Sequence, residues 1–427
     1  MSTVLEHLRF ANTSRRAVSY PRFFIPGLLS LLAFFCADAV AAGAFAMLTR
    51  EAFERSQAPW DPQIPAPLVE FDPPEGDDPL GLDFVEYGKL MGKPFYDDNV
   101  WWLRASPRGN FEKDPLDLRL RQPELGGQAP VVYRPADFNY RHPDIQPALP
   151  DVVPAGARYL SAVDIGVRQR GAERWPQMLH LGGNGYGRLT GFSPLEFGTS
   201  FRLGVRNVGE PTEDFVKLRK LYLMKINDQA FRLLGLAECE AFTTAFAATL
   251  QPGDASSLRI TMKIFPRLPL RVASEPSLGP LGLSSMFWKD ENATPDDPED
   301  EAHDADTFVA WYADGTQRRQ ALAVPTRPTE PPLAADFGAA TDFALIQSDR
   351  NAGHYRRYES VDYANRTSLL VSDIQSSLPY TVGLWQSYTA YEGADNIAAF
   401  VRFNRDMDPP ASVEEGIVFS YTLTAYR

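Results

Sequence analysis

The chain has 427 residues, of which 55 are acidic and 42 are Lys or Arg, and its formal net charge is −13. Nucleic-acid binding needs clustered basic side chains against phosphates, so this balance disfavours a nucleic-acid partner. It also disfavours adsorption to an anionic membrane. Hydrophobic residues make up 44% and aromatic residues 12% of the chain. A neutral ligand such as a sugar stays compatible with this composition, although aromatic rings more often fill cores.

Residues 1–46 carry the pattern of a secretory signal peptide or a membrane anchor. The basic pair Arg15-Arg16 precedes an apolar run from Phe23 to Ala37, and small residues follow with Ala39-Val40-Ala41 and Ala44-Phe45-Ala46 as cleavage candidates. Export by the Sec or the twin-arginine route and retention as an inner-membrane anchor both fit these residues. Either alternative places the bulk of the chain outside the cytoplasm.

Residues 47–81 are expected to form a linker, because seven prolines lie between Pro59 and Pro79 and resist both helix and sheet. Residues 82–427 are then one large domain, which begins with a short helical pattern at Leu82–Leu90. Gln251-Pro252-Gly253-Asp254 predicts the turn of a hairpin. Val216–Ile226 mixes the periods of strand and helix, so both stay open for that segment.

Alternating apolar residues of strand length dominate the large domain. The clearest examples are Leu116–Leu120, Gln128–Tyr133, Phe201–Val205, Leu258–Phe265, Phe308–Trp311, Ser368–Val371, Ile397–Phe403 and Ile417–Tyr426. The chain has neither long amphipathic helices after residue 90 nor a fixed-period repeat. These patterns predict an all-β sandwich with long loops and few short helices.

The sequence contains few of the side chains that bind metals or cofactors. Cys36 lies in the apolar N-terminal run and leaves Cys239 alone, so no disulfide framework is expected. The five histidines are scattered without ligand spacing, so we expect no metal site and no cofactor. No G-x-S-x-G, Walker or H-E-x-x-H motif is present, which disfavours serine hydrolases, nucleotide enzymes and zinc proteases. The glycine-rich run Gly182–Gly187 is either a tight turn or a loop close to a ligand.

Leu283–Phe308 is the most distinctive stretch, with seven carboxylates between Asp296 and Asp306 and no basic residue among them. A solvated acidic loop is the ordinary interpretation of such a run. A carboxylate site between two strands is the alternative. Calcium binding is a third, weaker interpretation, because the spacing fits no EF-hand.

The same stretch resembles the osmoregulated periplasmic glucan biosynthesis proteins G and D. Their T-S-M-F and E-V-H-D-S-D/N-G motifs correspond to Ser284–Phe287 and Glu301–Asp306. Further matches follow in collinear order over residues 82–427. They are Leu82–Tyr87 with Asn99–Trp102, Val132–Phe138, Leu181–Arg188, Thr212–Phe215, Phe265–Arg267, Ser348–Arg350 with His354-Tyr355, and Asp395–Phe400. Thr307 and Val216 depart from the pattern, and the resemblance ends near the end of the family's large sandwich, so we expect a chain without its immunoglobulin-like C-terminal domain.

The resemblance implies a galactose-mutarotase-like, carbohydrate-binding β-sandwich that acts on β-1,2-glucan in the periplasm. One implied activity is that of an inverting endo-β-1,2-glucanase, a glycoside hydrolase. The other is non-catalytic glucan binding that assists backbone synthesis or branching, in association with inner-membrane synthesis machinery. The resemblance leaves the choice between enzyme and binding protein open, and the oligomeric state is unknown.

The implied hydrolysis needs one carboxyl group that protonates the leaving oxygen and another that activates water. Asp304 corresponds to the motif carboxylate and is the expected general acid, because Trp288 and the charges of Glu301 and Asp306 would raise its pKa. Asp214 or Glu213 is the candidate base, with a strand-end role as the alternative. The expected substrate-binding residues, each with core packing or a surface hydrogen bond as its alternative, are His303, Glu301, Asp306, Arg350, Tyr355, Trp288 and Trp101, with Trp102 as a further aromatic candidate.

Overall fold

The structure is a computed structural model, and it describes the chain in separate stretches. These are residues 26–61, 92–108, 114–122, 127–138, 160–168, 176–192, 199–206, 214–271, 278–289, 301–303, 305–322, 327, 329–348, 367–388 and 395–426. For residues 26–40, 286–289 and 301–303, among others, only the course of the backbone is described. The chain divides into two compact units, residues 1–42 and 43–427, and the second holds all the strands.

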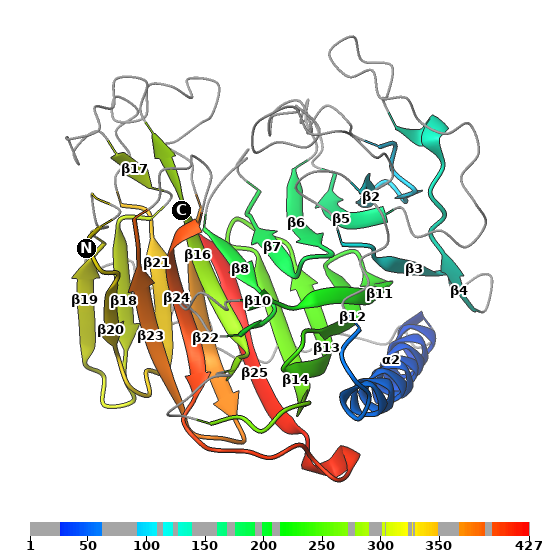
Figure 1. The fold of residues 1–427 in the computed structure, drawn as a ribbon. Coiled ribbons are helices and arrows are strands. Elements are labelled where there is room, and N and C mark those ends of the chain that lie inside the picture. The colour runs from blue at the N-terminus through cyan, green and yellow to red at the C-terminus, as the bar shows by residue number, and fades with distance from the viewer. Residues whose placement is uncertain are drawn as a thin grey trace, which may run out of the picture. The chain divides into compact units, whose positions relative to one another are not determined.

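Two large sheets make up the second unit, drawn as arrows in Figure 1. The first sheet has eleven strands. In spatial order they are β1 (Tyr96–Asp97), β2 (Trp101–Pro107), β5 (Leu160–Val167), β6 (Gln177–Gly182), β7 (Tyr186–Leu189), β8 (Ser200–Arg202), β16 (Leu281–Lys289), β24 (Asp395–Phe403), β23 (Tyr380–Gln386) and β20 (Leu333–Asp336), with β17 (Glu301–His303) paired to β16.

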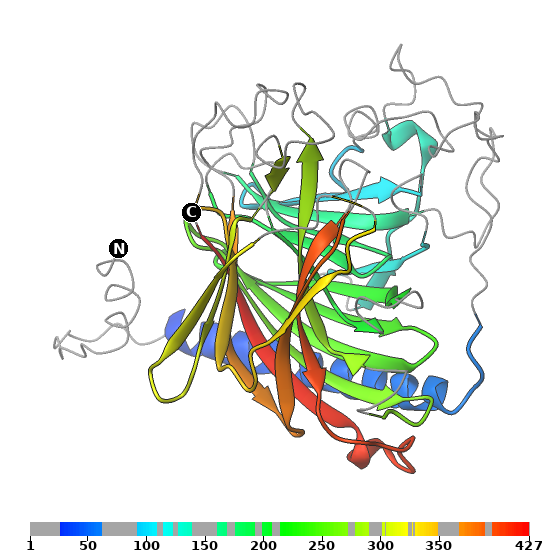
Figure 2. The same ribbon diagram turned by 60° about the vertical axis from the view of Figure 1, so that its left-hand side comes forward.

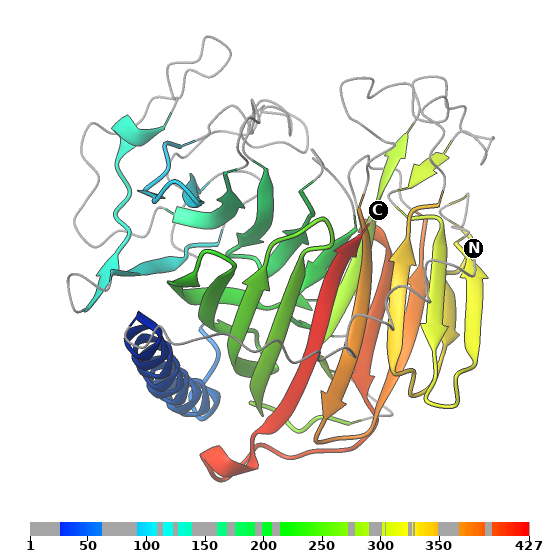
Figure 3. The same ribbon diagram turned by 180° about the vertical axis from the view of Figure 1, so that it is seen from behind.

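The second sheet also has eleven strands, and a sheet of three short strands lies beside the two. The order in the second sheet is β19 (Gln317–Ala321), β18 (Thr307–Trp311), β21 (Asp342–Ile346), β22 (Ser368–Ser376), β25 (Ile417–Tyr426), β14 (Ser257–Pro266), β13 (Phe242–Gln251), β12 (Ala230–Glu238), β11 (Lys217–Asn227), β3 (Asp117–Gln122) and β4 (Gly127–Pro130). Seen from behind, β25 runs between β14 and β22 (Figure 3). The small sheet joins β10 (Asp214–Phe215), β9 (Val205–Arg206) and β15 (Leu278–Gly279).

Apolar side chains from both large sheets form one continuous core. Leu103, Ile165 and Leu283 of the first sheet are fully buried in it, as are Phe246 and Leu423 of the second. Alternate residues of a strand point to opposite faces, so each strand gives one row of side chains to this core. The two sheets lie as two layers in Figure 2. The prediction of an all-β sandwich is confirmed.

The strand predictions succeeded even where the sequence was ambiguous. Val216–Ile226 corresponds to strand β11, which pairs antiparallel with β12 and parallel with β3. The predicted hairpin at Gln251–Asp254 joins β13 to β14. After residue 90, the described residues contain only short 3-10 helices, η2 (Pro135–Asp137) and η7 (Val413–Glu415). The predicted helical turn at Leu82–Leu90 lies outside the described residues.

The single α-helix of the described chain, α2 (Pro26–Ser56), covers part of the second sheet, and the mixed period of β11 coincides with its register shift between Leu218 and Lys220. In the second unit, Leu48 and Ala52 of this helix pack against Leu234 and Phe265 on the face of the second sheet that is turned away from the core. Both faces of the sheet are therefore covered where the helix packs. A strand covered on both faces, such as β12, carries apolar residues at nearly every position instead of at alternate ones. Residues 47–56, which we assigned to the linker, are thus helical and packed; residues 62–81 lie outside the described part.

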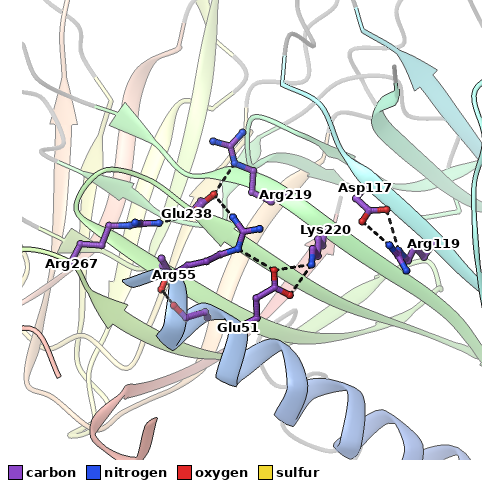
Figure 4. Close-up of polar contacts among 10 residues, drawn as sticks. Glu51, Arg55, Asp117, Arg119, Arg219, Lys220, Glu238 and Arg267 are labelled. Carbon is purple, nitrogen blue, oxygen red and sulfur yellow. Dashed lines mark hydrogen bonds and ion pairs between the residues drawn. The ribbon is translucent and has the colours of Figure 1, made fainter. Parts of the chain in front are cut away.

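Charged side chains tie the end of α2 to the second sheet (Figure 4). The buried carboxylate of Glu238 on β12 accepts from Arg55 of the helix at 3.0 Å and from Arg219 of β11 at 3.0 Å, and Arg267 pairs with it as well. One turn earlier, Glu51 pairs with Lys220 at 2.7 Å. This shared carboxylate fixes the helix against β11, β12 and the residue that follows β14.

The glycine-rich run is a tight turn where two backbones pass closely, which is the structural one of our two interpretations. Gly185 joins β6 to β7 with a φ of +72°, a conformation that favours glycine. A Cβ on Gly183 would lie 2.1 Å from the carbonyl oxygen of Asp114 and 3.0 Å from that of Ser161. Ser161 lies in β5 and both contacts are with backbone atoms, so a side chain at this position would force the backbone to shift.

Gly183→Ala is therefore expected to lower the free energy of unfolding by about 2 kcal/mol, the usual scale of overpacking. Urea denaturation followed by tryptophan fluorescence measures it. Gly253→Ala is the matched control, because its Cβ would meet no atom closer than 3.7 Å and should leave stability unchanged or slightly raised. Equal effects of the two substitutions would contradict the close-approach argument.

Within the part of the chain that the structure describes, no helix combines the length and the apolar character needed to cross a membrane.

Candidate functional site

A row of polar and aromatic side chains crosses the first sheet on its outer face, which we define as the face turned away from the core. The strand registers align one residue from each of nine strands. In spatial order these are Arg104, Asp164, His180, Arg188, Ser200, Ser284, Ala398, Trp385 and Ala334. Their sequence neighbours, such as Leu103, Ile165 and Leu283, are core residues, which fixes the row on the outer face.

Three residues at one end of the row form a tight ionic cluster. Arg104 donates from Nη2 to Oδ2 of Asp164 at 2.8 Å, and Nδ1 of His180 lies 2.8 Å from Oδ1 of the same carboxylate. The three side chains are 16%, 7% and 18% exposed, respectively. Burial raises the pKa of the Asp164 carboxyl, but the hydrogen bond and charge of His180 and the charge of Arg104 outweigh it, so this pKa lies below its ordinary value.

Next to this cluster lies a stack of rings and guanidinium groups. Nε of Arg188 donates to the hydroxyl of Tyr186 at 2.8 Å. The guanidinium carbon of Arg202 lies 4.4 Å from the ring centre of Tyr186 and 4.3 Å from that of Phe215. The His180 ring meets Tyr186 edge-on at 6.5 Å. Cation–π contacts of this kind hold the side chains in fixed positions.

Aromatic rings lie over glycines at both ends of the outer face. A Cβ on Gly166 would fall 2.2 Å from the Trp102 ring, and one on Gly383 would fall 2.6 Å from the Phe400 ring. Both glycines face their aromatic partner across neighbouring strands. Trp102 is buried, at 4% exposure, whereas Phe400 is partly exposed. Of these two rings, only Phe400 can therefore contact a hydroxyl-rich ligand on this face.

The predicted acidic site adjoins one end of β16. His303 pairs with Phe287 and Glu301 with Lys289, so β17 extends the first sheet at this end. The N–H of Ala305, a buried residue, donates to Oγ of Ser285 at 2.8 Å. Asp304 itself lies outside the described residues, as do Glu213, Arg350 and Tyr355. For Trp288, Glu301 and His303, the structure describes only the backbone.

Asp306 has a structural position at the start of β18. Its Oδ2 accepts from the N–H of Ser348 at 2.7 Å, and its Oδ1 accepts from the hydroxyl of Thr307 at 2.9 Å. Its own N–H donates to the carbonyl of Ile346 at 2.9 Å. These contacts fasten the segment that follows β17 to the second sheet. A substrate contact for Asp306 stays a prediction.

The structure does not bring Asp214 to the acidic site. Asp214 pairs with Arg206 of β9, and Arg206 pairs with Leu278 of β15, just before β16 begins. His303 pairs with Phe287, near the other end of β16. Six residue-to-residue steps of extended strand, from Leu281 to Phe287, put these ends roughly 20 Å apart. Inverting glycosidases place their two carboxyl groups only about 6.5–9.5 Å apart.

Trp101 is a core residue, which corrects its prediction as a sugar-stacking side chain. It is fully buried, its indole N–H donates to the carbonyl of Asn227 at 3.0 Å, and its ring lies 5.2 Å from that of Phe231. No ligand can reach it. The adjacent Trp102 points to the outer face, where Arg104 lies over its ring at 5.3 Å.

The described side chains offer no metal centre: nowhere among them do three or more His, Cys, Asp or Glu residues gather in an arrangement that could hold a metal ion.

The two large sheets and their shared core define an all-β sandwich protein. A comparison with family models makes this specific. The model described as "Periplasmic glucan biosynthesis protein, MdoG" matches residues 45–427, and the chain belongs to this family. The match begins inside α2, so the packed part of the helix belongs to the family's domain.

Curated relatives agree with the family. The chain is 26% identical over 321 residues to a protein of Shewanella oneidensis named "Probable glucans biosynthesis protein D", with 72% of this chain and 54% of that protein covered. It is 24% identical over 369 residues to "Glucans biosynthesis protein G" of Bradyrhizobium diazoefficiens, with 83% and 69% covered. The aligned region thus spans about half the length of the first relative.

Among solved structures, similarity is low. A protein of Synechocystis, Slr1438, is 14% identical with a TM-score of 0.25, covering 62% of this chain and 92% of that one. A galactose mutarotase related enzyme from Lactobacillus acidophilus is 11% identical with a TM-score of 0.24, covering 63% and 92%. The sandwich architecture therefore rests on the strands described above.

Sequence reasoning missed the ionic cluster, although it came close to it. The glycine-rich motif that carries the family resemblance contains Tyr186 and Arg188, and His180 lies just before that motif. His180 was only one of five scattered histidines, and Asp164 lay in an unremarked apolar stretch. The available signal was Asp164 itself: a carboxylate inside an apolar strand is expected to be buried, and a buried carboxylate needs a charged or hydrogen-bonding partner.

Proposed function

We propose that the chain is a periplasmic protein that acts on β-1,2-linked glucan as an inverting endo-β-1,2-glucanase, processing osmoregulated periplasmic glucans. The observation that supports a glucan ligand is the outer-face row, in which the partly exposed rings of Trp385 and of the neighbouring Phe400 lie beside the strand of Ser284. Membership of a glucan biosynthesis family supports the substrate class. Export by the Sec or twin-arginine route, with or without a retained anchor, is part of the proposal.

In the proposed reaction, Asp304 protonates the leaving glycosidic oxygen while a water molecule attacks the anomeric carbon from the other side. The bond to the leaving glucose breaks as the bond to the water oxygen forms, and a base takes the proton of that water. His303 and Ala305, on either side of Asp304, are held at Phe287 and Ser285 of β16. This anchoring supports a fixed position for the acid beside the row, because Ser285 follows the row member Ser284.

The general base is the second carboxylate that the mechanism needs. Asp214 lies roughly 20 Å away along β16, and Glu213 is its neighbour in sequence. For either carboxylate to act as the base, a chain of hydrogen-bonded water molecules must carry the proton over most of that distance. A substrate-binding role for Glu301, His303, Arg350, Tyr355 and Trp288 belongs to the same proposal.

The test compares wild type with Asp304→Asn on linear β-1,2-glucan. We expect wild type to shorten the polymer and the variant to be slower by about 10²–10⁴-fold, the usual contribution of a general acid. Size-exclusion chromatography follows chain length, and proton NMR of the new reducing ends shows whether the anomeric configuration inverts. Asp228→Asn is the control, because Asp228 is an exposed turn carboxylate, 68% accessible.

Unchanged glucan with wild-type protein would reject the hydrolase. The second candidate function is non-catalytic glucan binding that assists backbone synthesis or branching, together with inner-membrane synthesis machinery. Tyr186, Arg188 and Arg202 favour it, because their mutual contacts build a rigid surface without a carboxylate pair among them. Binding of the glucan without any cleavage supports this second function.

A further inference from the structure

At one end, the core between the two large sheets changes from apolar to polar side chains. Five strands each place a buried polar residue there, two positions away from a core residue of the same strand, so these polar residues also face the core. All of them are at most 1% exposed. We call them the polar layer: Thr199, Ser285 and Gln386 of the first sheet, and Gln347 and Thr367 of the second.

Strand register places the members of the polar layer side by side. Ser285 pairs with Ile397, and Ile397 pairs with Gln386 on the next strand. On the other side of Ser285, the register of β16 with β8 continues to Thr199. The N–H of Thr199 donates to the carbonyl of Thr367 at 3.2 Å, so the layer crosses from the first sheet to the second.

The hydroxyls of this layer need further hydrogen bonds. Among the residues that the structure describes, the buried Oγ1 atoms of Thr199 and Thr367 have no hydrogen-bond partner. The adjoining Ser285 accepts from the N–H of Ala305 at 2.8 Å and still has its own hydrogen to donate. A buried hydroxyl without a hydrogen bond costs free energy, and proteins meet this need with another protein group or with internal water. An internal water makes about three hydrogen bonds, which suits a place where three hydroxyls adjoin.

We propose that the polar layer is a binding site for internal water, in which a water molecule bridges the hydroxyls of Thr199 and Thr367 and joins the two sheets. The site takes a small neutral ligand that donates and accepts, because its side chains are uncharged hydroxyls and amides. Through Ser285 it adjoins Ala305, the residue after Asp304. The inference concerns the interior of the fold and does not depend on the proposed cleavage of glucan.

Substitution of threonine by valine tests the proposal, because valine has nearly the same shape and no hydroxyl. If water bridges the two hydroxyls, Thr199→Val or Thr367→Val removes one of its hydrogen bonds. The equilibrium constant for folding should then fall about 2- to 10-fold, the worth of one hydrogen bond. If the hydroxyl has no partner, the same substitution removes an unmet polar group and should stabilise the protein. The sign of the effect separates the two cases.

The double variant tests whether the two hydroxyls share one water. Once the first substitution has weakened the binding of the water, the second has less to lose, so the double variant should lose less stability than the two single losses together. Urea denaturation followed by circular dichroism measures all three variants. A crystal structure of the wild type that shows ordered water should place an oxygen within about 3.2 Å of both hydroxyl oxygens.

Two other threonines of β13 are the matched controls. The buried hydroxyl of Thr243 donates to the carbonyl of Ala52 at 2.6 Å, so Thr243→Val should show the loss expected when a known hydrogen bond is removed. Thr249 is partly exposed, and bulk water reaches its hydroxyl. Thr249→Val should therefore fold with the stability of the wild type.

Stabilisation by either single substitution at Thr199 or Thr367 would overturn the inference, as would single losses that simply add in the double variant. A wild-type crystal structure with a dry interior between the two hydroxyls would overturn it as well, even if a variant failed to fold. Single losses that are less than additive, together with the bridging water in the crystal structure, would support it.

Discussion

Trp101→Ala is expected to lower the free energy of unfolding by about 3–5 kcal/mol, the range for removing a large aromatic side chain from a core. Trp101 is fully buried, contacts the ring of Phe231, and donates a hydrogen bond to Asn227 across the two large sheets. The substitution leaves a cavity between the layers and an unpaired carbonyl group. Urea denaturation followed by circular dichroism measures the effect.

Trp385→Ala is the contrasting control for this prediction. Trp385 lies in the outer-face row and is partly exposed, so its removal should change stability little and weaken glucan binding instead. If Trp101→Ala kept wild-type stability but lost glucan binding, the assignment of Trp101 to the core would be wrong.

Glu238→Gln is expected to destabilise the fold by about 3 kcal/mol, because removing one partner from a buried ion-pair cluster leaves the others uncompensated. Glu238 is 6% exposed and receives Arg55, Arg219 and Arg267. The estimate is at the low end of the range since Arg55 is about a third exposed. Thermal unfolding and limited proteolysis near residues 43–61 measure the loss, and α2 should become the first cleavage region.

Asp408→Asn is the matched control. Asp408 also pairs with an arginine, Arg271, but it is 77% exposed. Solvent screens an exposed pair, so this variant should unfold like wild type. Similar losses for the two carboxylates would show that Glu238 does not hold the helix.

The fold was largely accessible from the sequence, because strand periodicity is a local signal. Leu258–Phe265 alternates along its own length, and Gln251–Asp254 carries its own turn chemistry. Residues 47–56 show the limit of this reasoning. The neighbouring prolines suggested a linker, yet the apolar stripe of Leu48 and Ala52 finds its partner nearly 200 residues later, on β12.

The candidate site was less accessible, because it depends on register. Trp101 and Trp102 are adjacent and equally aromatic, and a shift of one residue exchanges the core face of the sheet for its outer face. Arg104, Asp164 and His180 meet only because three strands pair in one register, across 60 and 16 residues of sequence. The acidic motif of β17 gave a signal within one segment, whereas the ionic cluster has no local pattern at all.

The outer-face row runs across the strands instead of along them. Nine strands at about 4.8 Å spacing give it a length of roughly 40 Å, and it joins β2, at residue 104, to β20, at residue 334. A polymer bound along this row would contact many strands at once and would oppose their local separation. A long glucan should therefore protect the whole first sheet from hydrogen exchange, whereas a short one should protect only the strands that it touches.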